Sequence, residues 1–226
     1  LRKALVESAI MRTRPMSELA SFMDSNDYFY GATSVMSTFI GNHDLPRVIH
    51  LGANNRLWGD DQGSGGKDRS WANQPSLPSE REAFERLANG FAVLFTNRGA
   101  PLVYYGDEIG LPGAGDPDNR RMMMWSGLSA NQSWLKERVA ALLAIRAAHP
   151  ALRRGVRTTM RVDADVWVYS RTTVGDTVYV AVNRGDSDKS IGGLPPGSLS
   201  ELVTGSSLVG PTATVPARQT RIFAVK

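Results

Sequence analysis

The spacing of apolar residues changes at Pro150, and no other feature of the chain limits its fold as strongly. Before Pro150, segments with helical spacing alternate with short apolar runs. After it, apolar and polar residues alternate, and glycine-containing turns separate the runs. Alternating helices and strands form α/β structures, whereas successive short strands form antiparallel sheets. The sequence therefore predicts an α/β domain over residues 1–150 and an all-β domain over residues 151–226.

Three helical segments are expected in the first domain. Residues 1–23 predict one or two short helices divided at Pro15, because proline lacks a backbone N–H. A helix over about 80–98 is indicated by apolar residues at helical intervals, and Ser79–Glu82 has the spacing of a capping box at its start. The third predicted helix runs from Ser133 to His149 and ends before Pro150.

Two short apolar runs, residues 35–41 and 100–106, predict buried parallel strands, and each is followed by a polar loop. The order of helices and strands is typical of barrels or doubly wound sheets. Both folds carry functional residues on the loops that follow the carboxyl ends of the strands. The loop over residues 45–78 is long enough to be functional.

The second domain is predicted to be a small antiparallel β-sandwich. Its hairpins are indicated by alternating runs at 166–169, 178–182 and 220–225, with a tight turn at 174–176. We expect it to close its own core around Trp167, Tyr179 and Val180, and therefore to resist protease as an isolated segment. Residues 1–150 alone are expected to aggregate or to pack loosely, with the helical stripes around Phe91 and Leu142 partly exposed.

Three clusters of polar residues are candidates for a catalytic or binding site. Asn42, His43 and Asp44 follow the first predicted strand, although Asn42 and Asp44 could equally cap the following turn. Asp107 and Glu108 follow the second strand. Adjacent residues of a strand face opposite sides, so one exposed carboxylate and one bonded to a neighbouring arginine are favoured over an acid/base pair. The third cluster, residues 116–121, combines carboxylates with guanidinium groups.

Several other readings are not favoured. The net charge of +4 lies within the strand-rich residues 151–226 and forms no basic helical stripe, so we expect no nucleic-acid partner. No apolar run is long enough to predict a membrane span, and the chain has no cysteine. Residues 63–67 do not fit a phosphate-binding loop, and the aspartates at 60, 61 and 68 do not fit a calcium loop.

The remaining histidines and the loop tryptophans carry weaker signals. His50 follows the first polar cluster, and His149 is typical of a helix C-terminus. Tryptophans at positions 58, 71 and 125 lie in or near the long loops, where packing the loop down is a commoner role than stacking on a sugar.

Two motifs resemble a known family. The first, FIGNHDLPR at residues 39–47, resembles the end of the seventh barrel strand in the α-amylase superfamily of glycoside hydrolases. The second, APLVYYGDEIGLPGAGDPDNRRMMMW at residues 100–125, is similar to the eighth strand and following loop, particularly in neopullulanase, maltogenic amylase and oligo-1,6-glucosidase relatives. The resemblance implies the last two β/α units of a TIM (β/α)8 barrel, followed by a small antiparallel β-sandwich.

The resemblance also implies roles for individual residues. Asp44 matches the family's catalytic aspartate that stabilises an oxocarbenium-like transition state, and His43 matches a histidine that holds sugar hydroxyls. A hydrogen bond that strengthens as the sugar ring flattens would lower the barrier. The implied substrate is an α-glucan or maltooligosaccharide. The resemblance implies that further side chains of the two motifs also bind it, namely Asn42, Arg47, Asp116, Asp118 and Arg120.

The family's nucleophile and general acid come from the fourth and fifth barrel strands, and nothing in this sequence matches them. We therefore expect a C-terminal portion of a larger retaining hydrolase or transglycosidase, inactive alone, whose partner is the N-terminal part of the barrel. A noncatalytic carbohydrate-binding or scaffold fragment is the alternative. These residues imply no required cofactor and no metal ligand set. Binding of Ca²⁺ and the choice between α-1,4 and α-1,6 bonds stay open.

Overall fold

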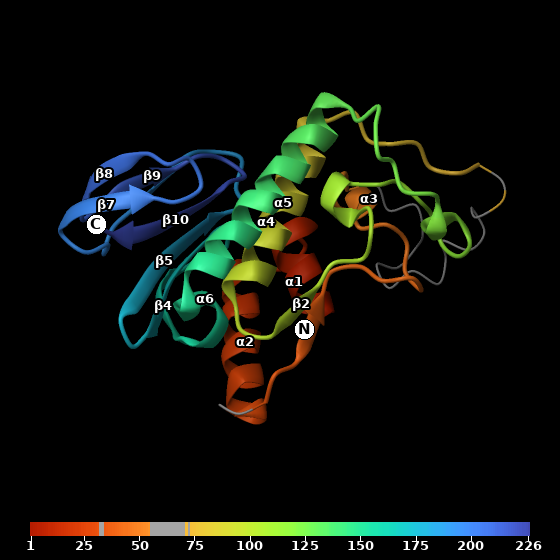
Figure 1. The fold of residues 1–226 in the computed structure, drawn as a ribbon. Coiled ribbons are helices and arrows are strands. Elements are labelled where there is room, and N and C mark those ends of the chain that lie inside the picture. The colour runs from red at the N-terminus through yellow and green to blue at the C-terminus, as the bar shows by residue number, and fades with distance from the viewer. Residues whose placement is uncertain (32–33, 55–70, 72) are drawn as a thin grey trace.

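The computed structural model describes residues 1–31, 34–54, 71 and 73–226 of the chain. It combines a layer of helices with an antiparallel sheet (Figure 1). Within these described residues, no helix is long and apolar enough to cross a membrane. The helical elements are α1 (Arg2–Leu5), the π-helix η1 (Val6–Ile10), α2 (Met16–Tyr30), α3 (Ile49–Gly52), α4 (Arg81–Thr96), the 3-10 turns η3 (Asp107–Ile109) and η4 (Asp118–Arg120), α5 (Ala130–Ala148) and α6 (Pro150–Arg154).

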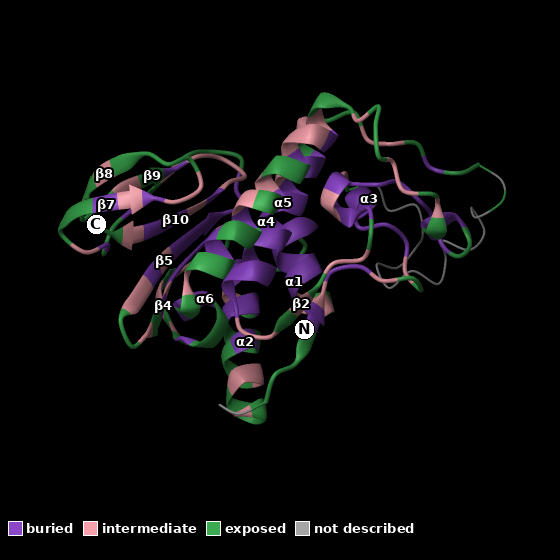
Figure 2. Cartoon of the chain, viewed as in Figure 1, coloured by how far each residue is buried: buried purple, intermediate pink, exposed green. Residues whose placement is uncertain are grey.

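Helix α4 lies at the centre of the helical layer and confirms the predicted helix over 80–98. Almost every residue from Ala83 to Thr96 is buried, so this helix is covered on all sides rather than along one stripe (Figure 2). The predicted capping box at its start is wrong. Glu80 is the N-cap residue and no side chain caps the helix, because Ser79 lies one position too early and hydrogen-bonds to the Glu80 side chain instead.

Helix α5 begins three residues before the predicted position and contains the capping box that sequence reasoning missed. Ser129 Oγ accepts a hydrogen bond from the Gln132 N–H at 3.2 Å, and Gln132 Oε1 accepts one from the Ser129 N–H at 3.1 Å. Two of the free N–H groups at the helix start are thereby satisfied. The helix ends before Pro150 as predicted, and Pro150 begins α6.

Strands β1 (Ser37–Phe39) and β2 (Ala100–Leu102) form a parallel pair, as their sequence predicted. Their predicted burial is wrong, since only Thr38 is buried and Leu102 is 45% exposed. The cause is the topology, because β1 and β2 pair only with each other and leave their other edges unpaired within the described residues.

Beyond residue 155 the chain is all strand and turn. Six strands form one sheet in the order β3-β4-β5-β10-β7-β8, and β6 and β9 form a separate antiparallel pair. The predicted hairpin with its turn at 174–176 is confirmed by the antiparallel pairing of β4 with β5. The strands are β3 (Val156–Val162), β4 (Val166–Thr173), β5 (Asp176–Asn183), β6 (Lys189–Ile191), β7 (Gly197–Glu201), β8 (Ser207–Gly210), β9 (Ala213–Val215) and β10 (Thr220–Val225).

The six-stranded sheet buries both of its faces, but against different layers. Trp167 and Val180 belong to the large core shared with α4 and the other helices, whereas Tyr179 packs against a smaller cluster that includes residues of β6 and β9. The expectation that these three side chains surround one self-contained core is therefore wrong, because neighbouring strand residues point to opposite faces. Phe91 and Leu142 are buried as well, contrary to the expected exposure.

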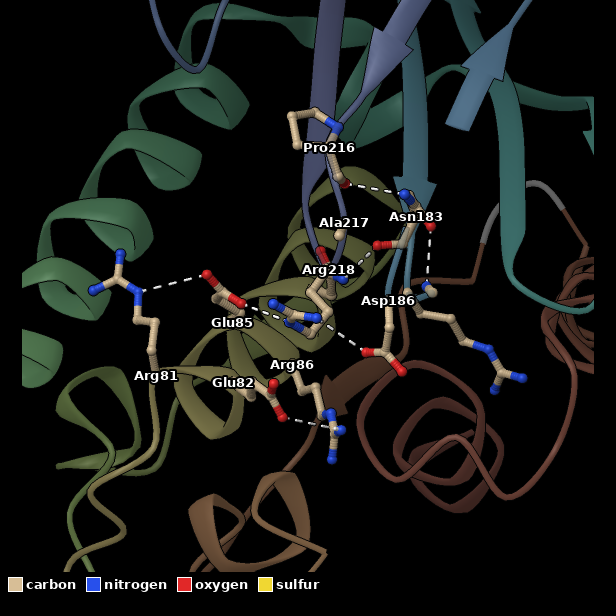
Figure 3. Close-up of polar contacts among 12 residues, drawn as sticks. Arg81, Glu82, Glu85, Arg86, Asn183, Asp186, Pro216, Ala217 and Arg218 are labelled. Atoms are coloured by element: carbon tan, nitrogen blue, oxygen red, sulfur yellow. Dashed lines mark hydrogen bonds and ion pairs between the residues drawn. The ribbon is translucent and has the colours of Figure 1, made fainter. Parts of the chain in front are cut away.

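Polar contacts also join α4 to the sheet (Figure 3). The Arg218 guanidinium donates to Glu85 of α4 at 2.8 Å and to Asp186, in the turn after β5, at 3.1 Å. The predicted domain boundary near residue 150 thus falls within one continuous apolar core. The division into two domains stays a prediction.

Candidate functional site

The candidate residues lie in two loop segments, residues 42–47 and 116–121. Both segments lie at one end of the helical layer, and the six-stranded sheet lies at the other end (Figure 1). His43 and Asp44 follow the carboxyl end of β1, and their side chains are 65% and 67% exposed. His43 Nε2 is 3.4 Å from Asp44 Oδ1. Asn42 Oδ1 accepts a hydrogen bond from the Asp44 N–H at 3.0 Å, so the turn-capping interpretation holds for Asn42.

The second loop brings Asp116 and Arg120 to the same place. Arg120 Nε lies 3.3 Å from Asp116 Oδ1, and it also donates to the His43 backbone oxygen at 3.3 Å. Both side chains are nearly half exposed. The structure therefore groups an imidazole, two exposed carboxylates and a guanidinium from two distant segments of the chain.

Arg47 and Asp118, two of the predicted sugar-contacting residues, are buried, each with only 1% of its side chain exposed. The Arg47 guanidinium donates to Asp107 Oδ1 at 3.1 Å and to the backbone oxygen of Asn119 at 2.7 Å. Asp118 accepts two hydrogen bonds from Arg121, both at 2.8 Å. Neither side chain is accessible to a ligand in this conformation, and their expected contact with sugar stays a prediction.

Asp107 lies beneath the first loop and pairs with Arg47, as the favoured interpretation predicted for one of the two carboxylates. Glu108, which that interpretation expected to be exposed, is only partly exposed. Burial raises the pKa of Asp107 to about 6, although the nearby Arg47 charge opposes this effect. A Cβ atom added to Gly41 would lie only 2.2 Å from Asp107 Oδ2. The absence of a side chain at Gly41 therefore lets the carboxylate pack against the backbone just before Asn42.

Asn119 and His50 connect the two loops and were missed as site residues. Asn119 Nδ2 donates to the backbone oxygens of His43 and Leu45 at 2.7 and 3.0 Å. His50 is fully buried in α3, and its Nε2 accepts a hydrogen bond from the Gly113 N–H at 3.0 Å. The only sequence signal was the position of Asn119 within the 116–121 cluster, and its partners lie more than 70 residues away.

The other candidates have simpler placements. Trp71 and Trp125 are more than 80% exposed, so the favoured packing role is wrong for both; Trp58 and the residues at 60–68 lie outside the described part of the chain. His149 caps the C-terminus of α5, as predicted, and lies 2.9 Å from Asp176. Among the described residues, no three His, Asp or Glu side chains are grouped as a metal site would require.

Exposed groups of this kind match the chemistry of sugar hydroxyls. A carboxylate accepts two hydroxyl donors, and imidazole and guanidinium groups supply donors for hydroxyl oxygens. The Arg47–Asp107 ion pair is buried beneath the two loops. Four side chains of the loops remain exposed to solvent, those of His43, Asp44, Asp116 and Arg120.

Comparison with known proteins was made by sequence and by fold, and no family model matches the chain. A cyclomaltodextrin glucanotransferase of Paenibacillus macerans is 32% identical over 199 residues, which are 86% of this chain and 23% of that enzyme. An α-amylase structure from Anoxybacillus superposes with a TM-score of 0.74 at 25% identity, over 96% of this chain and 44% of that one. The structure of AmyP with maltose gives a TM-score of 0.81 at 20% identity, over 99% of this chain and 48% of that one.

The chain thus spans about a quarter of this curated relative and less than half of each solved structure. The relatives are named as cyclomaltodextrin glucanotransferases and an α-amylase, and the structural neighbours include α-amylases. The sequence similarity and the shared fold place this chain in the α-amylase superfamily, where it corresponds to the C-terminal region.

Proposed function

We propose that this chain is the C-terminal portion of a retaining glycoside hydrolase or transglycosidase that acts on α-glucans. In this proposal β1 and β2, with the helices beside them, are the last two β/α units of a (β/α)8 barrel, and residues 151–226 form the following β domain. Among the described residues, the outer edges of β1 and β2 are unpaired, and this supports the proposal because a closed barrel pairs every strand edge.

Asp44 is the proposed transition-state stabiliser, and its placement is the observation that carries the proposal. The carboxylate is 67% exposed at the carboxyl end of a parallel strand, beside His43 and facing solvent. As the sugar ring flattens, hydroxyl groups that hydrogen-bond to this carboxylate gain more in the transition state than in the ground state. Asn42, His43, Asp116 and Arg120 would hold the same sugar or its neighbours. Bound maltose in the AmyP structure is consistent with an oligosaccharide substrate.

Arg47 and Asp118 act differently in this proposal. Because both side chains are buried, they hold the two loops in place rather than contact sugar. Retaining hydrolysis also needs a nucleophile and a general acid about 5 to 5.5 Å apart. The proposal assigns these to another part of the barrel, so the 226-residue chain alone should release no glucose or maltose from maltooligosaccharides.

The test is Asp44→Asn in the enzyme that carries this segment. We expect kcat to fall by at least about 100-fold with KM changed little, since the lost interaction matters most in the transition state. Asp24→Asn is the matched control, because Asp24 is also exposed and its partner Arg157 keeps a second ion pair with Asp27. An Asp44→Asn enzyme with activity close to that of the control would refute the assignment, as would turnover by the 226-residue chain itself.

A noncatalytic carbohydrate-binding fragment is the second candidate. It is favoured by the exposed indole rings of Trp71 and Trp125, whose faces are free to stack on sugars. Calorimetric binding of maltotriose to the 226-residue chain, lost in Trp125→Ala and retained in Asp44→Asn, would favour it over the enzymatic role.

A further inference from the structure

Asn119 lies directly beneath the exposed His43–Asp44 pair and is completely buried. Its Nδ2 donates to the His43 backbone oxygen at 2.7 Å and to the Leu45 backbone oxygen at 3.0 Å. The two bonds therefore hold the backbone on both sides of Asp44. Within the described part of the chain, Asn119 Oδ1 has no hydrogen-bond partner, so the side chain acts here only as a donor.

Asn119 is itself held by Arg47, a residue of the same loop as Asp44. Arg47 Nε donates to the Asn119 backbone oxygen at 2.7 Å, and the Arg47 N–H donates to Gly113 at 3.0 Å. The guanidinium also lies over the Tyr104 and Tyr105 rings, at 4.2 and 4.7 Å from their centroids. The two loops thus bind each other through reciprocal side-chain-to-backbone contacts.

We propose that Asn119 is a positioning residue for Asp44, an inference that rests on the proposed function. The Asp44 side chain is exposed, and His43 is the partner described for it, so its direction depends on the backbone that carries it. Asn119 fixes this backbone at residues 43 and 45. A displacement of about 1 Å at a reacting group can cost on the order of 100-fold in rate, so a small movement of this loop would be measurable.

A buried asparagine could instead stabilise the fold without any effect on the site, and Asn183 offers the matched control. Asn183 at the end of β5 is also fully buried. Figure 3 shows its contact with the Pro216 backbone oxygen. Its Nδ2 donates to the backbone oxygens of Ser187, Val215 and Pro216 at 2.9, 3.1 and 3.0 Å. Asn183 Oδ1 also accepts a hydrogen bond from the Gly185 N–H at 3.0 Å, and substitution by Asp retains this acceptor. Both residues therefore lose donor bonds on substitution by Asp, but only Asn119 touches the candidate site.

The first measurement is hydrogen exchange on the 226-residue chain, which needs no catalytic activity. Asn119→Asp keeps the shape of the side chain, and a carboxyl group donates at most one hydrogen bond, so at least one of the two bonds to His43 and Leu45 is lost. We expect amide exchange over residues 43–48 to accelerate at least tenfold in Asn119→Asp and to stay unchanged in Asn183→Asp. Equal exchange in the two variants over these residues would overturn the proposal.

The second measurement is steady-state kinetics in the enzyme that carries this segment. Asn119→Ala should lower kcat by about 10- to 100-fold with KM within about threefold. Asn183→Ala should keep kcat while lowering Tm. A kcat for Asn119→Ala no lower than that of Asn183→Ala refutes the positioning role. Should Asn119→Ala not fold, Asn119→Ser, which retains a shorter donor, takes its place with the same criterion.

Failure of the proposed function is distinguishable from failure of this inference. If Asp44→Asn keeps full activity, the catalytic assignment fails whatever the exchange experiment shows. If Asp44→Asn abolishes activity while Asn119→Ala behaves like Asn183→Ala, the catalytic assignment stands and the positioning role is refuted.

Discussion

Removal of residues 1–151 is expected to prevent residues 152–226 from folding, although the sheet pairs only with itself. One face of the six-stranded sheet packs on the helices, and six of its side chains are fully buried in the shared core. They are Trp167, Tyr169, Val178, Val180, Val182 and Ile222. In the isolated segment this face would be open to water.

The loss can be estimated from the burial. At about 1.5 kcal/mol for each side chain, the lower end for full burial of a large apolar group, exposure of this face forfeits about 9 kcal/mol. Domains of this size have unfolding free energies of only about 5–15 kcal/mol in total. The Tyr169 hydroxyl would also lose its contacts with Thr96 at 2.5 Å and Asn97 at 3.1 Å.

Three measurements on the isolated segment test this estimate. We expect trypsin to degrade residues 152–226 rapidly, the dye ANS to bind, and near-UV circular dichroism from Trp167 to be lost, all relative to the 226-residue chain. Addition of residues 1–151 as a separate chain is the control, and it should restore protection. A monomeric segment that resists trypsin, does not bind ANS and keeps slow amide exchange in β4 and β5 would refute the reasoning.

Two further predictions concern the pKa of Asp107 and the start of α5. Because the pKa of Asp107 rises from 3.8 to about 6 on folding, the native state binds its proton more tightly, and this group makes the free energy of unfolding fall by about 2 kcal/mol as pH rises from 4 to 7. Urea unfolding of Asp107→Asn should show that this part of the slope is gone, and an unchanged slope would contradict the shift. Ser129→Ala should lower the unfolding free energy by about 1 kcal/mol and Ser79→Ala by almost nothing, since only Ser129 caps a helix; equal losses would contradict the observed caps.

Apolar spacing predicted the local elements well because it reports directly on burial. The helical intervals around Phe91 located α4, and the alternation at 166–182 located the β4–β5 hairpin. Start positions were less predictable. Ser79 and Ser129 both precede a suitable residue by three positions, and only the structure shows which serine lies at the N-cap.

The site was predictable as a set of segments but not as a set of side-chain directions. Sequence reasoning found the loops of His43–Asp44 and Asp116–Arg120, which the structure brings together. It could not separate the exposed Asp116 from the buried Asp118, because both lie in one short acidic stretch and only the partner loop decides which turns inward. The burial of Arg47 and Asn119 could not be predicted either, because each is buried by contacts with the other loop.

The sheet also supports the candidate site from its far side. Helix α4 leads into β2 through a turn whose backbone oxygens at Asn97 and Gly99 accept hydrogen bonds from Arg146 at 2.8 and 2.7 Å. Tyr169 of β4 binds the same turn through Asn97. Because β2 pairs in register with β1, which leads to His43–Asp44, this turn is connected to the first loop through the two paired strands. In β4, the four consecutive residues from Val166 to Tyr169 are all buried, because Trp167 and Tyr169 face the core shared with the helices while Val166 and Val168 face the smaller core on the other side of the sheet.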